Sequence, residues 1–232
     1  MSTTSRKRRR TPPRPTVVLD FGGVLSAGHD PVDDLHDLLG GDRAALDAAL
    51  WEHRHAYDTA QLSAAEYWGR VAAAVGVDQL TEAEVDELQD ADNRYFLRLD
   101  PDARALVHDL ARNGVRLAIL SNASIAFGDA LRRADWFEAV TVAVVSGEEG
   151  IAKPDRELYE ILLDVLAHET GGVSIPSAVI FFDDRPENIE AARRLGIDAH
   201  LWPRNGDPHP DGTPHGADAA RAILAARGIS LD

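Results

Sequence analysis

The strongest constraint on the fold is the regular alternation of short apolar segments with helical segments along the chain. Runs rich in Val, Ile, Leu and Phe predict strands at 16–20, 115–120, 139–145, 178–182 and 198–202. Capping residues and periodic apolar residues predict helices at 101–112, 156–168, 186–196 and about 217–227. Helices between strands imply βαβ units, in which helices cover both faces of a parallel sheet. The sequence therefore predicts an α/β fold with a doubly wound parallel sheet.

Residues 31–95 are expected to form a small helical domain inserted after the first strand. They contain no convincing strand, and their Ala, Leu and aromatic residues recur at helical spacing, which predicts three or four helices. We expect Trp51, Tyr57 and Trp68 to pack inside this domain. The predicted division is a disordered basic tail at 1–15, an α/β core formed by 16–30 and 96–232, and the helical domain at 31–95. The segment 204–218 is rich in Gly, Pro, Asp and His and is expected to be a surface loop.

Composition and charge exclude several classes of protein. The chain has no Cys, so it has no disulfides, no thiol nucleophile and no Cys-based zinc site. The net charge is −15, and because residues 1–15 carry six basic side chains and no acid, the remainder carries −21 and should repel nucleic acid. No apolar run approaches the roughly 20 residues that span a bilayer, and no apolar stretch follows the basic N-terminus as in a secretory signal. We expect a soluble cytoplasmic protein with neither a nucleic-acid nor a membrane partner.

Polar residues stand at the ends of the predicted strands. They are Asp20, Ser121 with Asn122, Lys153 shortly beyond the third strand, and Asp183 with Asp184. In open α/β sheets ligands bind outside the carboxyl ends of the strands, so these side chains are expected to share one site. Carboxylates at close range destabilise one another unless a counter-ion is bound. The pattern therefore indicates that a ligand binds at this edge of the sheet.

The residue types at this edge favour a metal ion and an anion. The carboxylates of Asp20, Asp183 and Asp184, with the backbone carbonyl of Gly22, suit Mg²⁺, which prefers oxygen ligands. A Ser hydroxyl, backbone amides and a Lys supply donors for an anion. Together these groups fit phosphoryl transfer, in which a carboxylate attacks phosphorus and carries a covalent phosphate.

Four segments of the chain carry a resemblance to a known family. They are "VVLDFGGVL", "LAILSNAS", "GIAKPDRELYEILL" and "VIFFDDRPENIEAARRLGI". In this order they resemble motifs I to IV of the haloacid-dehalogenase-like hydrolase superfamily, and the resemblance spans roughly residues 16–203. It is strongest to bacterial sugar-phosphate phosphatases that act on glucose-1-phosphate-like substrates. The resemblance implies a Rossmann-like core, an inserted cap domain, and a Mg²⁺-dependent phosphatase of a small phosphorylated metabolite.

The resemblance also implies roles for individual residues. Asp20 would be the catalytic nucleophile that forms an aspartyl-phosphate. Ser121 and Asn122 would bind the phosphoryl oxygens, and Lys153 would neutralise charge on the phosphate and the nucleophile. The metal ligands would be Asp20, the carbonyl of Gly22 and Asp184, with Asp183 as a neighbour of the metal.

Gly22 departs from the family pattern, because phosphatases of this family usually have a second Asp two residues after the nucleophile. That Asp protonates the leaving oxygen and later activates water, and such acid–base help is worth about 10²–10⁴ in rate, or about 3–5 kcal/mol of barrier. Three outcomes follow. The enzyme acts on good leaving groups such as anomeric or acyl phosphates, it borrows a proton donor from the helical domain, or it hydrolyses nothing quickly. Candidate donors are His29, His53 and His55, although solvated roles are expected more often for the last two.

Two other functions remain open from the sequence. A 2-haloacid dehalogenase would share the Asp20 nucleophile and need no metal, but the adjacent Asp183 and Asp184 would repel its carboxylate substrate. A phosphate-binding pseudoenzyme is the non-enzymatic alternative, and it is motivated by Gly22.

Overall fold

The computed structural model describes residues 15–27, 31–169, 171–172, 174–203 and 216–231. His29, nearly all of the basic tail and most of the segment 204–218 lie outside the described residues, so the expectations for them stay predictions.

A five-stranded sheet forms the centre of the fold. Its strands are β1 (Thr16–Leu19), β2 (Arg116–Ser121), β3 (Val142–Val145), β4 (Val179–Asp183) and β5 (Asp198–Leu201). All neighbouring strands pair in parallel, in the order β3-β2-β1-β4-β5. This confirms the predicted α/β fold with a parallel sheet. The third strand is shorter than predicted, because Phe137–Ala139 forms a 3₁₀ turn and Val140 and Thr141 lead from it into β3.

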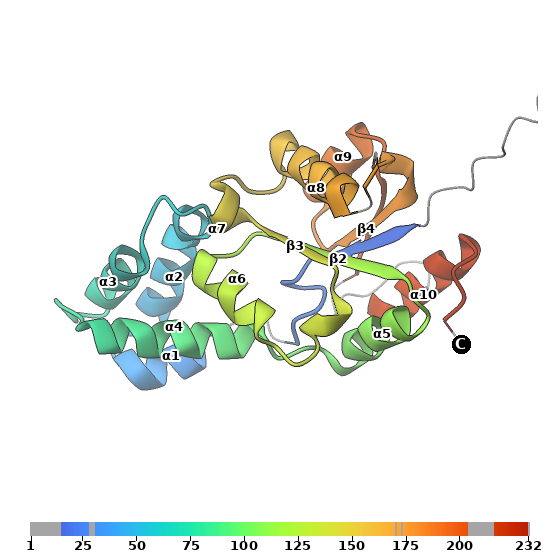
Figure 1. The fold of residues 1–232 in the computed structure, drawn as a ribbon. Helices are drawn as coiled ribbons and strands as arrows, with labels where there is room; N and C mark the ends of the chain where they lie inside the picture. The colour runs from blue at the N-terminus through green and yellow to red at the C-terminus, as the bar shows by residue number, and fades with distance from the viewer. Residues whose placement is uncertain (1–14, 28–30, 170, 173, 204–215, 232) are drawn as a thin grey trace, which may run out of the picture.

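Helices cover both faces of the sheet (Figure 1). One face carries α5 (Pro101–Arg112), α6 (Ile125–Arg132) and α10 (Gly216–Ala226), and the other carries α8 (Arg156–Glu169) and α9 (Pro186–Arg194). Because successive strand residues point to opposite faces, Val17 and Leu19 join the first apolar cluster while Val18 joins the second. Both faces of the sheet are therefore buried, as the apolar strand sequences indicate.

Four helices lie between β1 and α5 in the sequence and form what we call the helical unit. They are α1 (Val32–Leu39), α2 (Arg43–Asp58), α3 (Ala64–Ala74) and α4 (Glu82–Phe96). The unit has its own apolar cluster, which includes Tyr57, Tyr67 and Trp68, and it lies at one end of the molecule (Figure 1). Capping boxes at Ser63 and Thr81 fix the starts of α3 and α4.

The two chain segments that join the helical unit to the sheet run beside each other. Ser26 and Leu99 form an antiparallel bridge, the Ala27 N–H donates to the Arg98 carbonyl at 2.7 Å, and the Asp100 N–H donates to Leu25 at 2.8 Å. The unit is therefore attached through one paired connection, close to the end of β1.

Two helices were not predicted from the sequence. They are α6 and the four-residue α7 (Ser146–Glu149), which directly follows β3. Both are short, and both begin near the carboxyl ends of strands. Among the described residues, no helix combines the length and the apolar character that crossing a membrane requires.

Candidate active site

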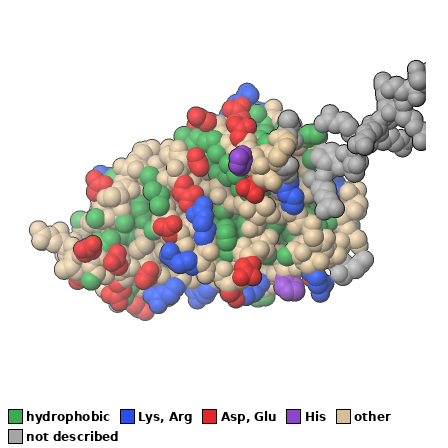
Figure 2. Space-filling view, viewed as in Figure 1, with side chains coloured by type: hydrophobic (Ala, Val, Ile, Leu, Met, Phe, Trp, Pro, Cys, Tyr) green, Lys and Arg blue, Asp and Glu red, His purple; other side chains and the backbone are tan. Residues whose placement is uncertain are grey.

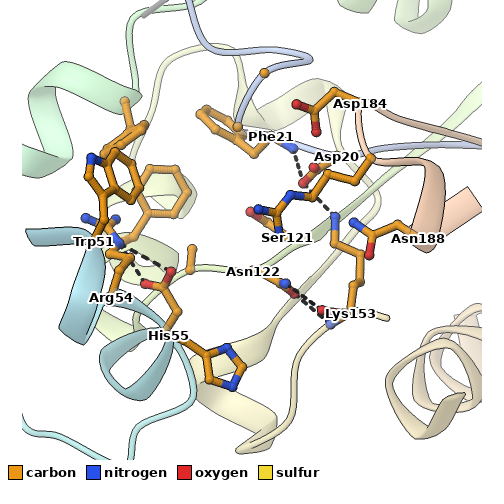
Figure 3. Close-up of a pocket in the computed structure, with 17 residues that line it drawn as sticks. Asp20, Phe21, Trp51, Arg54, His55, Ser121, Asn122, Lys153, Asp184 and Asn188 are labelled. Carbon is orange, nitrogen blue, oxygen red and sulfur yellow. Dashed lines mark hydrogen bonds and ion pairs between the residues drawn. The ribbon is translucent and has the colours of Figure 1, made fainter. Parts of the chain in front are cut away.

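Most of the polar residues predicted at the strand ends line one cavity at the edge of the sheet (Figure 3): Asp20, Ser121, Asn122, Lys153 and Asp184. Asp20 directly follows β1, Ser121 ends β2, and Asp183 ends β4. The segment after α7 brings in Lys153, whose Nζ lies 2.7 Å from Asp20 Oδ1 and 2.7 Å from Asp183 Oδ2. One ammonium group thus joins the ends of β1 and β4.

Lys153 is held rigidly in this position. Its side chain is buried, and besides the two carboxylates its Nζ donates to the Leu120 carbonyl at 2.8 Å. Burial lowers the pKa of Lys153, but the charges of Asp183 and Asp20 outweigh burial, so the pKa lies above its ordinary value. The ammonium therefore stays charged and fixed beside Asp20.

Asp20 is a buried carboxyl whose protonation depends on its surroundings. Only 7% of the residue is exposed, and its Oδ1 accepts a hydrogen bond from the Phe21 N–H at 2.6 Å. Burial raises the pKa of Asp20 to about 8, with Lys153 opposing the rise and Asp183 and Asp184 adding to it. A nearby divalent cation would favour the ionised form that a nucleophile requires.

The carboxylates of Asp20, Asp183 and Asp184 offer ligand oxygens that all lie within 4.8 Å of one another. Three carboxylates against one ammonium leave an excess of negative charge, and oxygen donors of this kind fit a hard cation such as Mg²⁺. Gly22 lines the same cavity. The residues present therefore fit a divalent metal ion.

Several protein groups surround the Asp183 carboxylate. Its oxygens accept from Lys153 Nζ, from Asn188 Nδ2 at 2.9 and 3.0 Å, and from the Arg185 N–H at 2.8 Å. It is fully buried, whereas Asp184 is partly exposed and lines the cavity. Asp183 therefore orients Lys153, and Asp20 and Asp184 are the acids better placed for a metal.

The structure requires glycine at only one of the two positions that hold glycine after Asp20. Gly23 has φ +74°, and a Cβ there would lie 2.5 Å from Asp184 Oδ2, so a side chain would displace the acid. At Gly22 a Cβ would meet no heavy atom within 4 Å. The backbone thus requires glycine at 23, while position 22 has room for a side chain.

Asn122 lines the cavity, but its side-chain amide contacts the backbone of Lys153. Asn122 Nδ2 donates to the Lys153 carbonyl at 2.9 Å, and the Lys153 N–H donates to Asn122 Oδ1 at 2.8 Å. This reciprocal pair ties the end of β2 to the segment that carries Lys153. Ser121 is buried at the end of β2 and also lines the cavity.

A cavity of about 470 Å³ opens in front of these groups, and the helical unit supplies its far side. Residues of that unit in the lining are Trp51, Arg54, His55, Asp58 and Phe96. Of the candidate proton donors, His55 lines the cavity and His53 is not among its described lining residues. The expectation that Trp51 packs inside the unit was wrong, because 46% of this residue is exposed, whereas Tyr57 and Trp68 are buried as expected.

Arg54, Asp58 and Phe96 were not singled out from the sequence. Arg54 Nε lies 3.1 Å from Asp58 Oδ1 and its Nη1 lies 2.9 Å from Asp92 Oδ1, so the guanidinium joins α2 to α4. An i, i+4 Arg–Asp pair is common on exposed helices, and nothing in its spacing indicates that this one faces a cavity.

Comparison with known proteins agrees with this geometry. A model of the haloacid dehalogenase-like hydrolases matches residues 15–196. Phosphatase MT3486 of Mycobacterium tuberculosis is 33% identical over 145 residues, which are 62% of this chain and 64% of that protein. The aligned region thus spans slightly less than two thirds of that relative.

Two solved structures show the same fold. A HAD family enzyme from Bacteroides thetaiotaomicron, in complex with magnesium and inorganic phosphate, has a TM-score of 0.62 and 15% identity and covers 87% of this chain and 100% of its own. L-2-haloacid dehalogenase from Xanthobacter autotrophicus, with chloropropionic acid covalently bound, has a TM-score of 0.63 and 18% identity and covers 94% and 84%. The family model matches most of the chain, and the protein therefore belongs to the haloacid dehalogenase-like hydrolases.

Proposed function

We propose that the protein is a Mg²⁺-dependent phosphatase that hydrolyses a small phosphorylated metabolite through an aspartyl-phosphate on Asp20. The observation that carries the proposal is the position of the Asp20 carboxylate. It lies against Lys153 at 2.7 Å and within 4.8 Å of the oxygens of two further acids, in a cavity of about 470 Å³. A nucleophile, a fixed cation and a candidate metal site are thus within reach of one bound phosphate.

The proposed reaction has two steps. An Asp20 oxygen attacks phosphorus, the bond from phosphorus to the leaving oxygen breaks, and the leaving oxygen departs as an anion that takes a proton from solvent. Water then attacks the aspartyl-phosphate, which releases inorganic phosphate and regenerates the Asp20 carboxylate. Bound Mg²⁺, held by Asp20, Asp184 and the Gly22 carbonyl, would supply charge stabilisation for the phosphoryl oxygens.

The other residues of the site bind and orient. The Lys153 ammonium neutralises charge on the phosphoryl group and on Asp20, and Asp183 fixes that ammonium at 2.7 Å. Ser121 binds a phosphoryl oxygen through its hydroxyl. Because the amide of Asn122 is engaged by the Lys153 backbone, we propose that Asn122 contacts the phosphoryl group through its main chain.

Gly22 leaves this site without the acid that phosphatases of the family usually have. We therefore propose substrates with good leaving groups, such as anomeric or acyl phosphates, which need little proton transfer. His55, in the cavity lining, is the described candidate for a borrowed proton donor. We also propose that residues 31–95 act as a cap over the site, because α2 supplies most of the far side of the cavity.

The fold is compatible with both a phosphatase and a dehalogenase, but the acidic residues of the site favour a phosphatase. A haloacid carries a carboxylate, and Asp20, Asp183 and Asp184 within 4.8 Å of one another would repel it unless a cation is bound. The site therefore favours a metal-dependent reaction, and magnesium dependence separates the two activities.

A screen of phosphorylated metabolites with Mg²⁺ and with EDTA tests the proposal. We expect turnover with Mg²⁺, at least a hundredfold less with EDTA, and none by Asp20→Asn, while the exposed Asp164→Asn on α8 keeps full activity. Phosphate release that is unaffected by EDTA or by Asp20→Asn would contradict the proposal. If the wild type with Mg²⁺ turns over nothing and fluoroberyllate does not bind at Asp20, the pseudoenzyme is the better description.

A further inference from the structure

The Lys and Arg side chains that line the cavity differ in how strongly other protein groups hold them. Lys153 lies 2.7 Å from each of two carboxylates, and Arg54 lies 3.1 and 2.9 Å from two others. Both side chains are buried, with 1% and 12% exposed. Arg185 has a single ion pair with the described residues, to Glu187, and 55% of its side chain is exposed. Of these three cations, Arg185 therefore has the charge that is least used within the protein.

The ion pair between Arg185 and Glu187 is weak. Arg185 Nε lies 3.8 Å from Glu187 Oε1, which is beyond hydrogen-bond distance, and both side chains are 55% exposed. Exposed ion pairs of this kind contribute about 0–1 kcal/mol. An anionic group of a ligand can therefore replace Glu187 as the partner of Arg185 at little cost.

The main chain of Arg185 is held in place although its guanidinium is exposed. Its N–H donates to Asp183 Oδ1 at 2.8 Å, and its carbonyl accepts from the N–H groups of Asn188 and Ile189 at 3.1 and 3.2 Å. Pro186 follows at the first position of α9 and restricts the backbone before it. The guanidinium thus extends from a fixed point of the cavity wall.

This point lies on the sheet side of the cavity, near its opening. Arg185 stands in the chain between Asp184 and Asn188, which Figure 3 shows across the cavity from Trp51. Asp20, where phosphorus would be attacked, is only 7% exposed, whereas more than half of the Arg185 side chain is exposed. The guanidinium therefore faces the part of a substrate that lies outside the transferred phosphoryl group.

A guanidinium at this position suits an anionic group. Its planar edge carries two N–H donors that match the two oxygens of a carboxylate or a phosphate. The N-terminus of α9, where Arg185 is the capping residue, adds partial positive charge. On the opposite wall, Arg54 already contacts Asp58 and Asp92. Among the described residues of the lining, recognition of a further anion therefore depends on Arg185.

We propose that Arg185 determines specificity by binding a second anionic group, a carboxylate or a phosphate, on the leaving group of the substrate. This inference rests on the proposed phosphatase function and extends it to the part of the substrate that is released. Lys153 and the other groups near Asp20 bind the phosphoryl group that is transferred. Arg185 binds the second anion, and Glu187 is released to solvent.

Kinetics at pH 7.5 with Mg²⁺ on three aryl phosphates of similar shape test this role. They are meta-carbamoylphenyl phosphate, which has a neutral substituent, meta-carboxyphenyl phosphate and resorcinol bisphosphate. We expect the wild type to have a KM about tenfold lower for at least one of the two anionic substrates than for the carbamoyl substrate, the effect of one good contact. The anion with the lower KM shows whether a carboxylate or a phosphate is preferred.

Arg185→Gln should abolish this tenfold preference and change KM for the carbamoyl substrate less than twofold. Arg185→Lys should recover only part of the preference, because an ammonium lacks the planar pair of donors. The matched control is Arg194→Gln, which removes the same charge at the other end of α9, from a side chain that is 76% exposed and lies outside the cavity lining. It should keep the wild-type preference.

Equal wild-type KM values for the three substrates would overturn the role of Arg185 but leave the phosphatase proposal intact. An equal rise of KM for all three in Arg185→Gln would also overturn it, because Arg185 would then act on the transferred phosphoryl group. If the wild type turns over none of the three substrates, both proposals fail. The Arg185 side chain is exposed and its main-chain hydrogen bonds do not depend on it, so the variants should fold, which a thermal melt checks.

Discussion

The two glycines after Asp20 differ, because the structure requires glycine at position 23 but not at position 22. Gly23 cannot change without displacing Asp184, whereas a Cβ at Gly22 would meet nothing within 4 Å. The absent acid is therefore not a consequence of crowding. A carboxylate side chain at 22 would project from the segment that follows Asp20 and lines the cavity.

Restoring the acid should broaden the range of leaving groups. We expect Gly22→Asp to raise kcat/KM for alkyl phosphates, which have poor leaving groups, by about 10² or more, because a general acid contributes about 10²–10⁴. Acyl phosphates should change little. The measurement is log kcat/KM against leaving-group pKa, which should be steep for the wild type and flatter for the variant.

Gly23→Asp is the matched control for this substitution. It adds the same side chain one residue later, where it must displace Asp184, so we expect lower Mg²⁺ affinity and lower activity on every substrate. A flat dependence on leaving-group pKa already in the wild type would contradict the preference for good leaving groups.

At the scale of elements, the short helix α7 joins the helical unit to the site. Ser146, at its first position, is fully buried. Its hydroxyl donates to the Asp58 carbonyl at the end of α2, at 2.5 Å, and accepts from the Ala123 N–H at 2.9 Å. Gly147 follows, and a Cβ there would lie 2.6 Å from the Ile125 nitrogen, so α7 packs closely on the segment after β2.

Removing this hydroxyl should affect both stability and activity. Ser146→Ala leaves the Ala123 N–H and the Asp58 carbonyl without this buried partner, so we expect the free energy of unfolding to fall by about 1–3 kcal/mol. Because Ala123 follows Ser121 and Asn122, which we propose bind the phosphoryl group, kcat/KM should fall about tenfold or more as this segment shifts. Urea denaturation and steady-state kinetics measure the two effects.

Ser63→Ala provides the comparison for Ser146→Ala. Ser63 caps α3 on the exposed side of the helical unit, and its loss should cost about 1 kcal/mol without any change in kcat/KM. Activity lost in proportion to stability in both variants would mean that Ser146 has only a structural role.

At the scale of the whole molecule, negative charge is concentrated where the sheet ends and over parts of the surface. Figure 2 shows acidic side chains spread over the helical unit on the viewed face. At the sheet edge, Asp20, Asp183 and Asp184 approach one another against the single ammonium of Lys153. The folded protein without metal therefore bears electrostatic repulsion that the unfolded chain does not, and a bound cation would relieve it.

Mg²⁺ should accordingly stabilise the fold. A ligand at about 100 times its Kd adds about 2.7 kcal/mol, which for a chain of this size corresponds to a rise in Tm of about 5–10 °C. Thermal melts in EDTA and in saturating Mg²⁺ give the shift. We expect Asp184→Asn to lose most of it and Asp164→Asn to keep it; an unchanged shift in Asp184→Asn would place the metal elsewhere.

The sequence by itself determined the architecture and which polar residues stand at the carboxyl ends of the strands. Strands recognisable from their apolar residues must lie parallel when helices connect them, and parallel strands end at the same edge of a sheet, which brings Asp20, Ser121 and Asp183 together. The burial of Tyr57 and Trp68 was likewise predictable from the helical spacing of apolar residues.

Tertiary structure alone decided how the side chains at that edge are used. Residue spacing does not predict that the Asn122 amide hydrogen-bonds to the backbone of Lys153, or that Asn188 and Lys153 contact the Asp183 carboxylate. Nor does it predict that Trp51 is exposed at the cavity. The physical reason is that periodicity fixes which face of its own element a residue occupies. Which residue of another element contacts it depends on how the sheet and the helices pack. That packing brings together residues as far apart in the chain as Asn122 and Lys153.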